Sequence, residues 1–244
     1  MKRLIIISAA AMLAMFSATS CRFIKIDESK FDTDSGISVN ISGNKGTVKG
    51  SDKEVKRVFS DFDKIVVLSI DGSTDITIRQ SENTELSLEL PENLEEYLRV
   101  DYAASACKIY LDKDYKYTNA KFDIVLGTSD LERLVINGAA EVEMKNMELG
   151  DIAFEINGAA DVDVNHVKCG DLSIEINGAG EVDAQGLDCG DIDVEINGAG
   201  EIDLGGKCKD VNVEINGTGS IDISRLERSG RETIRKSGIV TVKK

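Results

Sequence analysis

The octapeptide Ile136-Asn137-Gly138-Ala139-Ala140-Glu141-Val142-Glu143 decides the fold, because related octapeptides follow it at nearly constant spacing. They begin at Ile156, Ile176, Ile196 and Ile215, which gives steps of 20, 20, 20 and 19 residues. A period near 20 with strand-like alternation is typical of a solenoid in which each repeat is one coil, and it is too short for a four-stranded propeller blade. We therefore predict an all-β fold, a right-handed parallel β-helix (β-solenoid) with coils of about 20 residues, since parallel crossover connections are right-handed.

Stacked coils place equivalent residues in columns, one strand spacing or ~4.8 Å apart. Three columns are apolar in every coil and are predicted to line the core. They are Val142, Val162, Val182, Ile202 and Ile221; Ile152, Leu172, Ile192 and Val211; and Phe154, Ile174, Val194 and Val213. The segment Ile70-Asp71-Gly72-Ser73-Thr74-Asp75-Ile76 follows the same template, so the less regular first half is predicted to join the stack.

Two polar columns have predicted structural roles. The Asn column (Asn137, Asn157, Asn177, Asn197 and Asn216) lies at a tight turn, where side-chain amides can hydrogen-bond from coil to coil. The Asp column (Asp151, Asp171, Asp191 and Asp210) follows Gly in three coils and is predicted to cap turn amides.

A cysteine column contains Cys169, Cys189 and Cys208 and opens with Leu149. We predict that these thiols point inward and stay free, as small hydrophobic groups. A disulfide between adjacent coils is an alternative, although a Cα spacing near ~4.8 Å is toward the short end of disulfide geometry. A metal site is disfavoured, because no second ligand type recurs beside the thiols.

The formal net charge of −15 belongs to the repeats. Between residues 133 and 224 there are 20 Asp and Glu but 5 Lys and Arg, whereas the rest of the 244-residue chain has 24 of each. Since nucleic acid binding depends on Lys and Arg, we predict no nucleic acid partner. The charge favours cationic or cation-bridged partners over bare anionic ones.

Four acidic columns hold most of this charge. One is the Asp column, and a second is Glu155, Glu175, Glu195 and Glu214. The other two flank an inward Val or Ile and share one outer face: Glu141, Glu143, Asp161, Asp163, Glu181, Asp183, Glu201 and Asp203, with Asp222 continuing the stack. This face either is solvated by diffuse counter-ions or binds divalent cations such as Ca²⁺, which prefer carboxylate oxygens. No other cofactor is predicted.

The N-terminus resembles a bacterial lipoprotein signal. A basic start, an apolar run from Leu4 to Phe16 and small residues lead to Cys21, which is then the lipid-attachment residue. A plain secretory signal is the alternative. We expect a signal peptide over 1–20, an anchor and tether over 21–58 with a short strand at Ile37–Ile41, a solenoid over 59–224 with regular repeats over 133–224, and a C-terminal cap over 225–244.

No catalytic constellation is found in the sequence. His166 is the single His, and its predicted place is an exposed loop with no orienting acid beside it. Enzymes that cleave carbohydrates have locally irregular sites, whereas the acidic columns are almost uniform. We therefore predict a non-catalytic protein.

The chain resembles the head GIN domain of auto-transporter adhesins, common in Bacteroidetes. The resemblance rests on Phe62-Asp63-Lys64-Ile65, on Asp71–Ile78 and on serial turns of the type Gly198-Ala199-Gly200. It implies a β-helix related in shape to pectin lyases without their catalytic residues, and a role in adhesion.

The sequence therefore predicts an adhesin anchored by lipid to the outer membrane, with an acidic repeat face. Its partner is an envelope or extracellular macromolecule, such as a polysaccharide or host protein. The cell surface and the periplasmic face both stay open, because Arg22-Phe23-Ile24-Lys25 lacks the acidic run of surface-exported lipoproteins. Alternatives are a periplasmic structural or stress-response protein and, less favoured, a carbohydrate-active enzyme.

Overall fold

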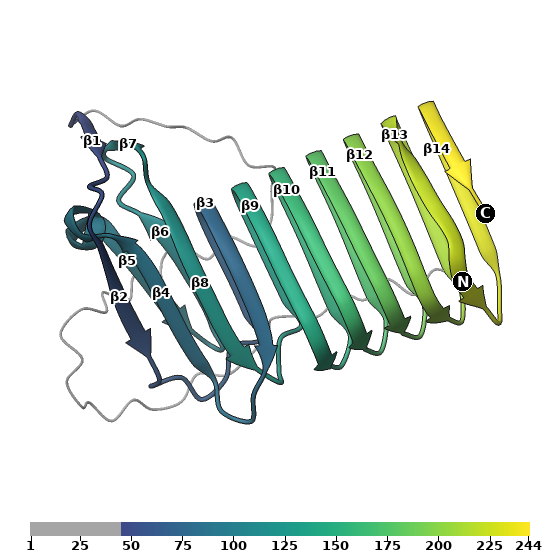
Figure 1. Cartoon of the computed structure of the whole chain (residues 1–244), viewed down its shortest axis with the longest axis horizontal. Helices are drawn as coiled ribbons and strands as arrows, with labels where there is room; N and C mark the ends of the chain where they lie inside the picture. The colour runs from purple at the N-terminus through teal and green to yellow at the C-terminus, as the bar shows by residue number, and fades with distance from the viewer. Residues whose placement is uncertain (1–44) are drawn as a thin grey trace.

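Each repeat forms one long strand, and the strands stack in parallel. The computed structural model describes residues 45–244, and Figure 1 shows an even row of similar strands over its C-terminal part, beside an irregular N-terminal end. The regular coils are β9 (Arg133–Glu148), β10 (Ile152–Lys168), β11 (Leu172–Asp188), β12 (Ile192–Cys208) and β13 (Val211–Arg228). Together with the flanking coils they make a β-solenoid of about six turns, which confirms the predicted fold class.

The register follows the sequence repeat residue by residue. Ile156 pairs with Ile136 and with Ile176, and Ile196 pairs with Ile215. The apolar columns are buried as predicted, with Val142 at 0% exposure and Leu172 and Ile174 at 1%. Side chains at equivalent interior positions pack on one another along the stack. Each regular coil is therefore stabilised by the coil before it and the coil after it.

The corners at the Asn column differ from the predicted tight turn. The strand continues through each corner, where Gly138, Gly158, Gly178, Gly198 and Gly217 have φ between 153° and 158°. A Cβ on Gly198 would lie 2.0 Å from the carbonyl oxygen of Gly178. The corner therefore bends the backbone without breaking the ladder, and only Gly fits there.

The first half joins the stack as predicted. β3 (Val67–Gln80) pairs in parallel with β9, and Gly72 lies opposite Gly138. On its other side β3 pairs in parallel with β6 (Ala106–Leu111) and β8 (Lys121–Thr128).

The residues inserted between β3 and β9 build a cap at the N-terminal end of the stack. β4 (Glu85–Pro91) pairs antiparallel with β8, and β5 (Leu98–Ala103) pairs antiparallel with β6. A 3-10 helix, η1 (Glu92–Tyr97), links β4 to β5. Leu86, Leu88 and Leu94 are buried beneath this cap, so it closes the end of the core.

The described part of the predicted tether is structured. β1 (Thr47–Lys49) pairs with β7 (Lys116–Thr118), and β2 (Glu54–Phe59) pairs antiparallel with β4. Val48, Val55 and Phe59 pack against the core, and this packing explains the order of residues 45–58. The signal peptide, Cys21 and the strand expected at Ile37–Ile41 lie outside the described residues.

The C-terminal segment adds one more coil to the stack. β14 (Glu232–Lys243) pairs in register with β13. Glu232 and Lys236 replace the apolar residues of two core columns, opposite Val211 and Ile215. Charged residues at inward positions of an edge strand oppose further strand addition, and a capping role for residues 225–244 stays a prediction. Within residues 45–244, no helix has the length and apolar character that crossing a membrane requires.

Candidate binding surface

The Asn column forms a continuous hydrogen-bonded ladder. Asn157 Nδ2 donates to Asn137 Oδ1 over 3.2 Å, and Asn177, Asn197 and Asn216 repeat the contact at 3.1–3.2 Å. All these amides donate in the same direction, toward the N-terminal cap. The predicted structural role of the Asn column is therefore confirmed.

Asp71 receives the last donor of this ladder. Asn137 Nδ2 lies 2.8 Å from Asp71 Oδ1, and Lys108 Nζ lies 3.0 Å from Asp71 Oδ2. Burial favours the protonated acid, but the Asn137 hydrogen bond and the charges of Lys108 and Lys113 outweigh it, so the pKa of Asp71 lies below its usual range. The template match placed Asp71 in the Asn column, and its different residue type was the signal of this terminal role.

The carboxylates of two of the four acidic columns accept hydrogen bonds from other groups of the solenoid. The backbone N–H of Asp171 donates to Asp151 Oδ1 over 2.9 Å, and the same contact recurs in the following coils, as predicted. In the second column, Glu175 Oε1 accepts from Asn177 Nδ2 over 2.9 Å, and Glu155 and Glu195 accept in the same way. These carboxylates satisfy donors of the fold.

A third column is partly neutralised by neighbouring side chains. Arg225 pairs with Asp203, Lys145 pairs with Glu143, and Lys243 pairs with Asp222 over 2.6 Å. Gln185 Nε2 also donates to Asp183 Oδ1 over 2.7 Å. The repeat pattern did not predict these partners, because Lys145, Gln185 and Arg225 each occur in one coil only.

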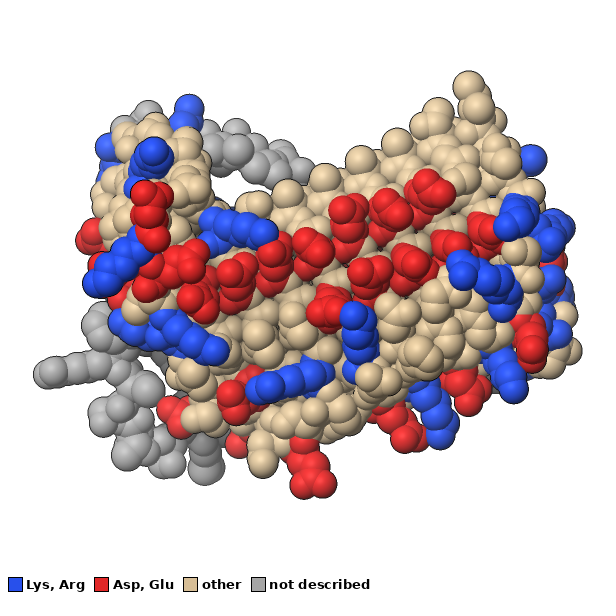
Figure 2. Space-filling view, in the orientation of Figure 1, with Lys and Arg blue, Asp and Glu red and all other residues tan. Residues whose placement is uncertain are grey.

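The fourth column is left with free carboxylates. It consists of Glu141, Asp161, Glu181 and Glu201, which we call the acidic ladder, and all four side chains are exposed. Among residues 45–244, no hydrogen bond or ion pair involves these carboxylates, although the charge of Lys121 acts on Glu141. Figure 2 shows acidic side chains in regular rows that run along the stack.

The predicted cation face gains no preformed metal site. Within the described residues, no three His, Cys, Asp or Glu side chains are grouped so that they could hold a metal ion. The fixed strand spacing separates carboxylates across the coils, and in the third column Glu143, Asp183 and Asp203 already have partners. Cation binding at Glu141, Glu143, Asp161, Asp163, Glu181, Asp183, Glu201 and Asp203 stays a prediction.

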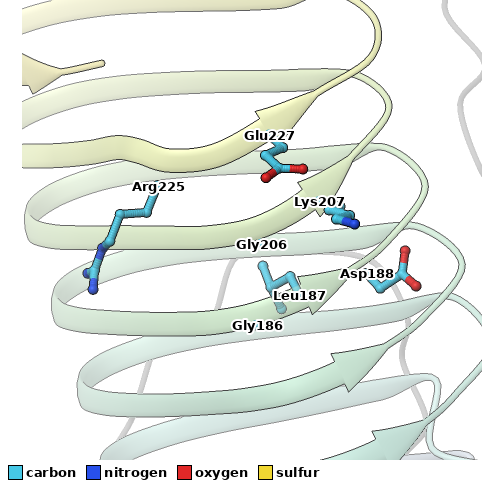
Figure 3. Close-up of a pocket in the computed structure, with 7 residues that line it drawn as sticks. All are labelled: Gly186, Leu187, Asp188, Gly206, Lys207, Arg225 and Glu227. Atoms are coloured by element: carbon cyan, nitrogen blue, oxygen red, sulfur yellow. The ribbon is translucent and has the colours of Figure 1, made fainter.

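Two open hollows lie on the surface of residues 45–244. One, of about 360 Å³, lies beside the acidic ladder, where Ala139, Ala140, Ala159 and Ala160 form its floor next to Glu141 and Asp161. Another, of about 330 Å³, contains Lys207 and Arg225, and Figure 3 shows these two side chains pointing away from each other. It lies where the register between β11 and β12 shifts, because Ala184 pairs with Leu204 but Leu187 pairs with Gly206, so β12 has one residue fewer in this segment. Both shapes suit contact with an extended partner better than enclosure of a small molecule.

His166 lies exposed at a second corner of the coil. Its φ of 54° matches the φ of 53° at Asn146 and 66° at Gly186 in the neighbouring coils. The predicted exposure is confirmed, although the residue lies within β10 rather than in a loop. The backbone conformation, which suits Asn, His or Gly, accounts for the residue types in this column.

The predicted burial of the thiols holds only in part. Cys208 and Cys107 are buried, whereas Cys169 and Cys189 are half-buried, with 2.6 Å between their sulfur atoms. Both half-buried residues lie just beyond the ends of their strands and pack against the edge of the core.

Comparison with known proteins gives a family match over most of the chain. Residues 61–239 match the family described as "Putative auto-transporter adhesin, head GIN domain". The chain belongs to this family. A comparison of the sequence with curated proteins gives no match.

Solved structures share the fold of this GIN-domain chain at low sequence identity. A "putative lipid binding protein" from Parabacteroides distasonis has a TM-score of 0.65 at 18% identity, covering 81% of this chain and 100% of its own. A "putative adhesin" from Bacteroides fragilis has a TM-score of 0.58 at 19% identity, covering 80% and 99%. Another "putative adhesin", from Parabacteroides merdae, has a TM-score of 0.50 at 17% identity, covering 81% and 99%. These likenesses support the fold.

Proposed function

We propose that this GIN-domain chain is a non-catalytic, lipid-anchored adhesin of the bacterial envelope that binds its partner through the acidic ladder. The observation that carries the proposal is the set of four exposed carboxylates without partners, at a fixed spacing of ~4.8 Å on a rigid surface. In the other acidic columns most carboxylates accept from donors or pair with basic side chains of the fold, with Asp163 as an exception, so the acidic ladder is the column left entirely for a partner.

The proposed partner is an extended macromolecule of the envelope or extracellular space, such as a polysaccharide or a host protein. A flat ladder of like charges complements a chain with regularly spaced cationic groups, and it can also bind an anionic chain through bridging Ca²⁺. Like charge along the ladder repels bare anionic polymers.

The binding test replaces the four ladder carboxylates with neutral isosteres. The variant combines Glu141→Gln, Asp161→Asn, Glu181→Gln and Glu201→Gln, and the probes are immobilised cationic and anionic polysaccharides with and without Ca²⁺. We expect at least a tenfold loss of binding to a cationic probe, or to an anionic probe in Ca²⁺. Chelation separates the two modes, because only the bridged mode needs the metal ion.

A matched control changes the same number of charges outside the ladder. It combines Asp52→Asn, Glu54→Gln, Glu82→Gln and Glu132→Gln, and it is expected to keep wild-type affinity. Equal loss in both variants would mean that net charge alone attracts the probe, and unchanged binding by the ladder variant would contradict the proposed surface.

The proposed location is tested on intact cells by protease shaving and antibody labelling. Removal of the domain by an added protease, with loss of labelling, is expected for a surface adhesin anchored through Cys21. A domain that stays protected until the outer membrane is opened would instead favour the periplasmic structural role.

A further inference from the structure

Two thiols of adjacent coils lie closer together than free thiols need to be. Cys169 Sγ and Cys189 Sγ are 2.6 Å apart, compared with about 2.05 Å in a disulfide. The backbone holds the pair in place, because the N–H of Cys169 donates to Asp188 O over 3.2 Å and the N–H of Cys189 donates to Lys207 O over 3.0 Å. The contact therefore arises from the stacking of β10 on β11.

In-register strand spacing is toward the short end of the Cα separations found in disulfides, but this pair lies outside the strands. Cys169 directly follows the end of β10 at Lys168, and Cys189 directly follows the end of β11 at Asp188. Outside the regular ladder, side chains are not confined to the parallel directions that keep paired strand residues apart. Both thiols are also half-buried rather than buried, so a dissolved reagent can reach them.

The two thiols are not equivalent. A hydrogen bond from Cys169 stabilises the thiolate of Cys189, which lowers the pKa of Cys189 and raises the pKa of Cys169. Thiolates are the nucleophiles of thiol–disulfide exchange, and the 2.6 Å contact lets the thiol of one cysteine stabilise the thiolate of the other.

We infer that Cys169 and Cys189 are a disulfide-forming pair that links two adjacent coils when a disulfide oxidant is present. One thiolate of the pair attacks one sulfur of the oxidant disulfide, forms a mixed disulfide and releases the other sulfur as a thiolate. The second cysteine then loses its proton and attacks the sulfur of the first, which releases the second oxidant thiolate. One oxidant disulfide is reduced to two thiols, and two cysteine thiols become one disulfide.

The remaining described cysteines stay reduced. Cys107 is 1% exposed and burial raises its pKa to about 12, so it is neither accessible nor ionised. Cys208 follows Cys189 in the column but is 6% exposed, and burial raises its pKa as well. We therefore expect the disulfide to form between Cys169 and Cys189, after β10 and β11, and not between Cys189 and Cys208.

The test oxidises the folded full-length chain with oxidised glutathione and maps the products by mass. Cleavage after glutamate separates the thiols, because Glu175 and Glu181 lie between Cys169 and Cys189, and Glu195 lies between Cys189 and Cys208. We expect a linked pair of peptides that contain Cys169 and Cys189, which a reductant separates. The oxidised chain is also expected to have a Tm about 5 °C or more above the reduced chain, since the link closes a loop of about 20 residues.

Single substitutions make the assignment falsifiable. Cys208→Ser is the matched control and should leave both the linked peptides and the Tm gain unchanged. Cys189→Ser should abolish both, since Cys169 and Cys208 lie two coils apart. Free thiols or separate glutathione adducts at Cys169 and Cys189 in the folded chain would overturn the inference, and so would a dominant link between Cys189 and Cys208. These outcomes are independent of whether the acidic ladder binds a partner.

Discussion

Asp71 illustrates how a single side chain completes a structure that the repeat alone cannot finish. Every Asn of the ladder donates toward the N-terminal cap, so the first Asn needs an acceptor beyond the repeats, and Asp71 supplies it. The sequence predicted the Asn column because the same residue recurs at a fixed step. It did not predict Lys108 as the partner of Asp71, because Lys108 belongs to the inserted cap, where the template is absent.

Replacement of Asp71 by Ala is expected to lower the free energy of unfolding by about 1–3 kcal/mol, because it leaves a partly buried amide and Lys108 without an acceptor. Urea denaturation at neutral pH measures the change. Asp71→Asn keeps an acceptor oxygen and is expected to lose less. Equal stability of Asp71→Ala and wild type would show that the terminal contact contributes nothing.

The contribution of Asp71 is also expected to depend on pH. Its pKa is lower in the folded chain than in the unfolded chain, so the unfolded state binds the proton more readily. The stabilisation is fully present above the pKa of Asp in the unfolded chain, about 3.9, and is lost as the pH falls through the lower pKa of Asp71 in the folded chain. The difference in stability between wild type and Asp71→Asn should therefore shrink below about pH 4, as denaturation measured in a pH series would show.

At the scale of single elements, the sequence predicted that Gly lies at each corner of the coil. It did not predict that the strand continues through the corner. The repeated Asn-Gly indicated a turn between short strands, as it does in hairpins. In a stack of parallel coils, the neighbouring coil supplies backbone partners through the corner, so Gly bends a continuous strand instead. Local turn chemistry cannot distinguish these outcomes, because the difference depends on a neighbour 20 residues away.

Gly198→Ala tests the corner. The new Cβ would lie 2.0 Å from Gly178 O at a φ of 153°, so we expect a loss of about 2–4 kcal/mol in unfolding free energy. Gly150→Ala is the matched control, since a Cβ there meets no heavy atom within 4 Å. Circular dichroism during urea denaturation compares them, and equal stabilities would contradict the steric argument.

At the scale of the whole molecule, charge is distributed along columns rather than over a surface at random. The sequence predicted the columns and their outward direction, since acids alternate with buried Val or Ile. It could not show which columns remain free, because non-repeating residues such as Lys145 and Arg225 neutralise one of them. The free ladder is thus a result of the assembled stack.

Glu181→Gln is expected to stabilise the fold, because Glu181 pairs in register with Asp161 on one side and Glu201 on the other. Relief of like-charge repulsion should add about 0.5 kcal/mol to the unfolding free energy at low ionic strength and almost nothing in ~1 M salt. Glu82→Gln, outside the repeats, should show no such salt dependence. A salt series of denaturation curves would contradict the argument if the two variants behaved alike.

Lys236→Ile is expected to promote end-to-end association. Lys236 lies opposite buried Ile215 in the last coil, so Ile would extend an apolar core column to the open edge of β14. Arg235→Ile adds the same side chain on the outer face and is the control. Light scattering should detect oligomers of the first variant at concentrations where the control stays monomeric.

Because the coils stack in register, the length of the solenoid can change by whole coils. Each regular coil contacts only the coils before and after it. Duplication or deletion of one 20-residue unit in the gene would preserve the amide ladder, the corners and both ends of the stack. It would lengthen or shorten the stack by ~4.8 Å and the acidic ladder by one carboxylate. Selection can therefore tune the length of such a protein without redesigning the fold.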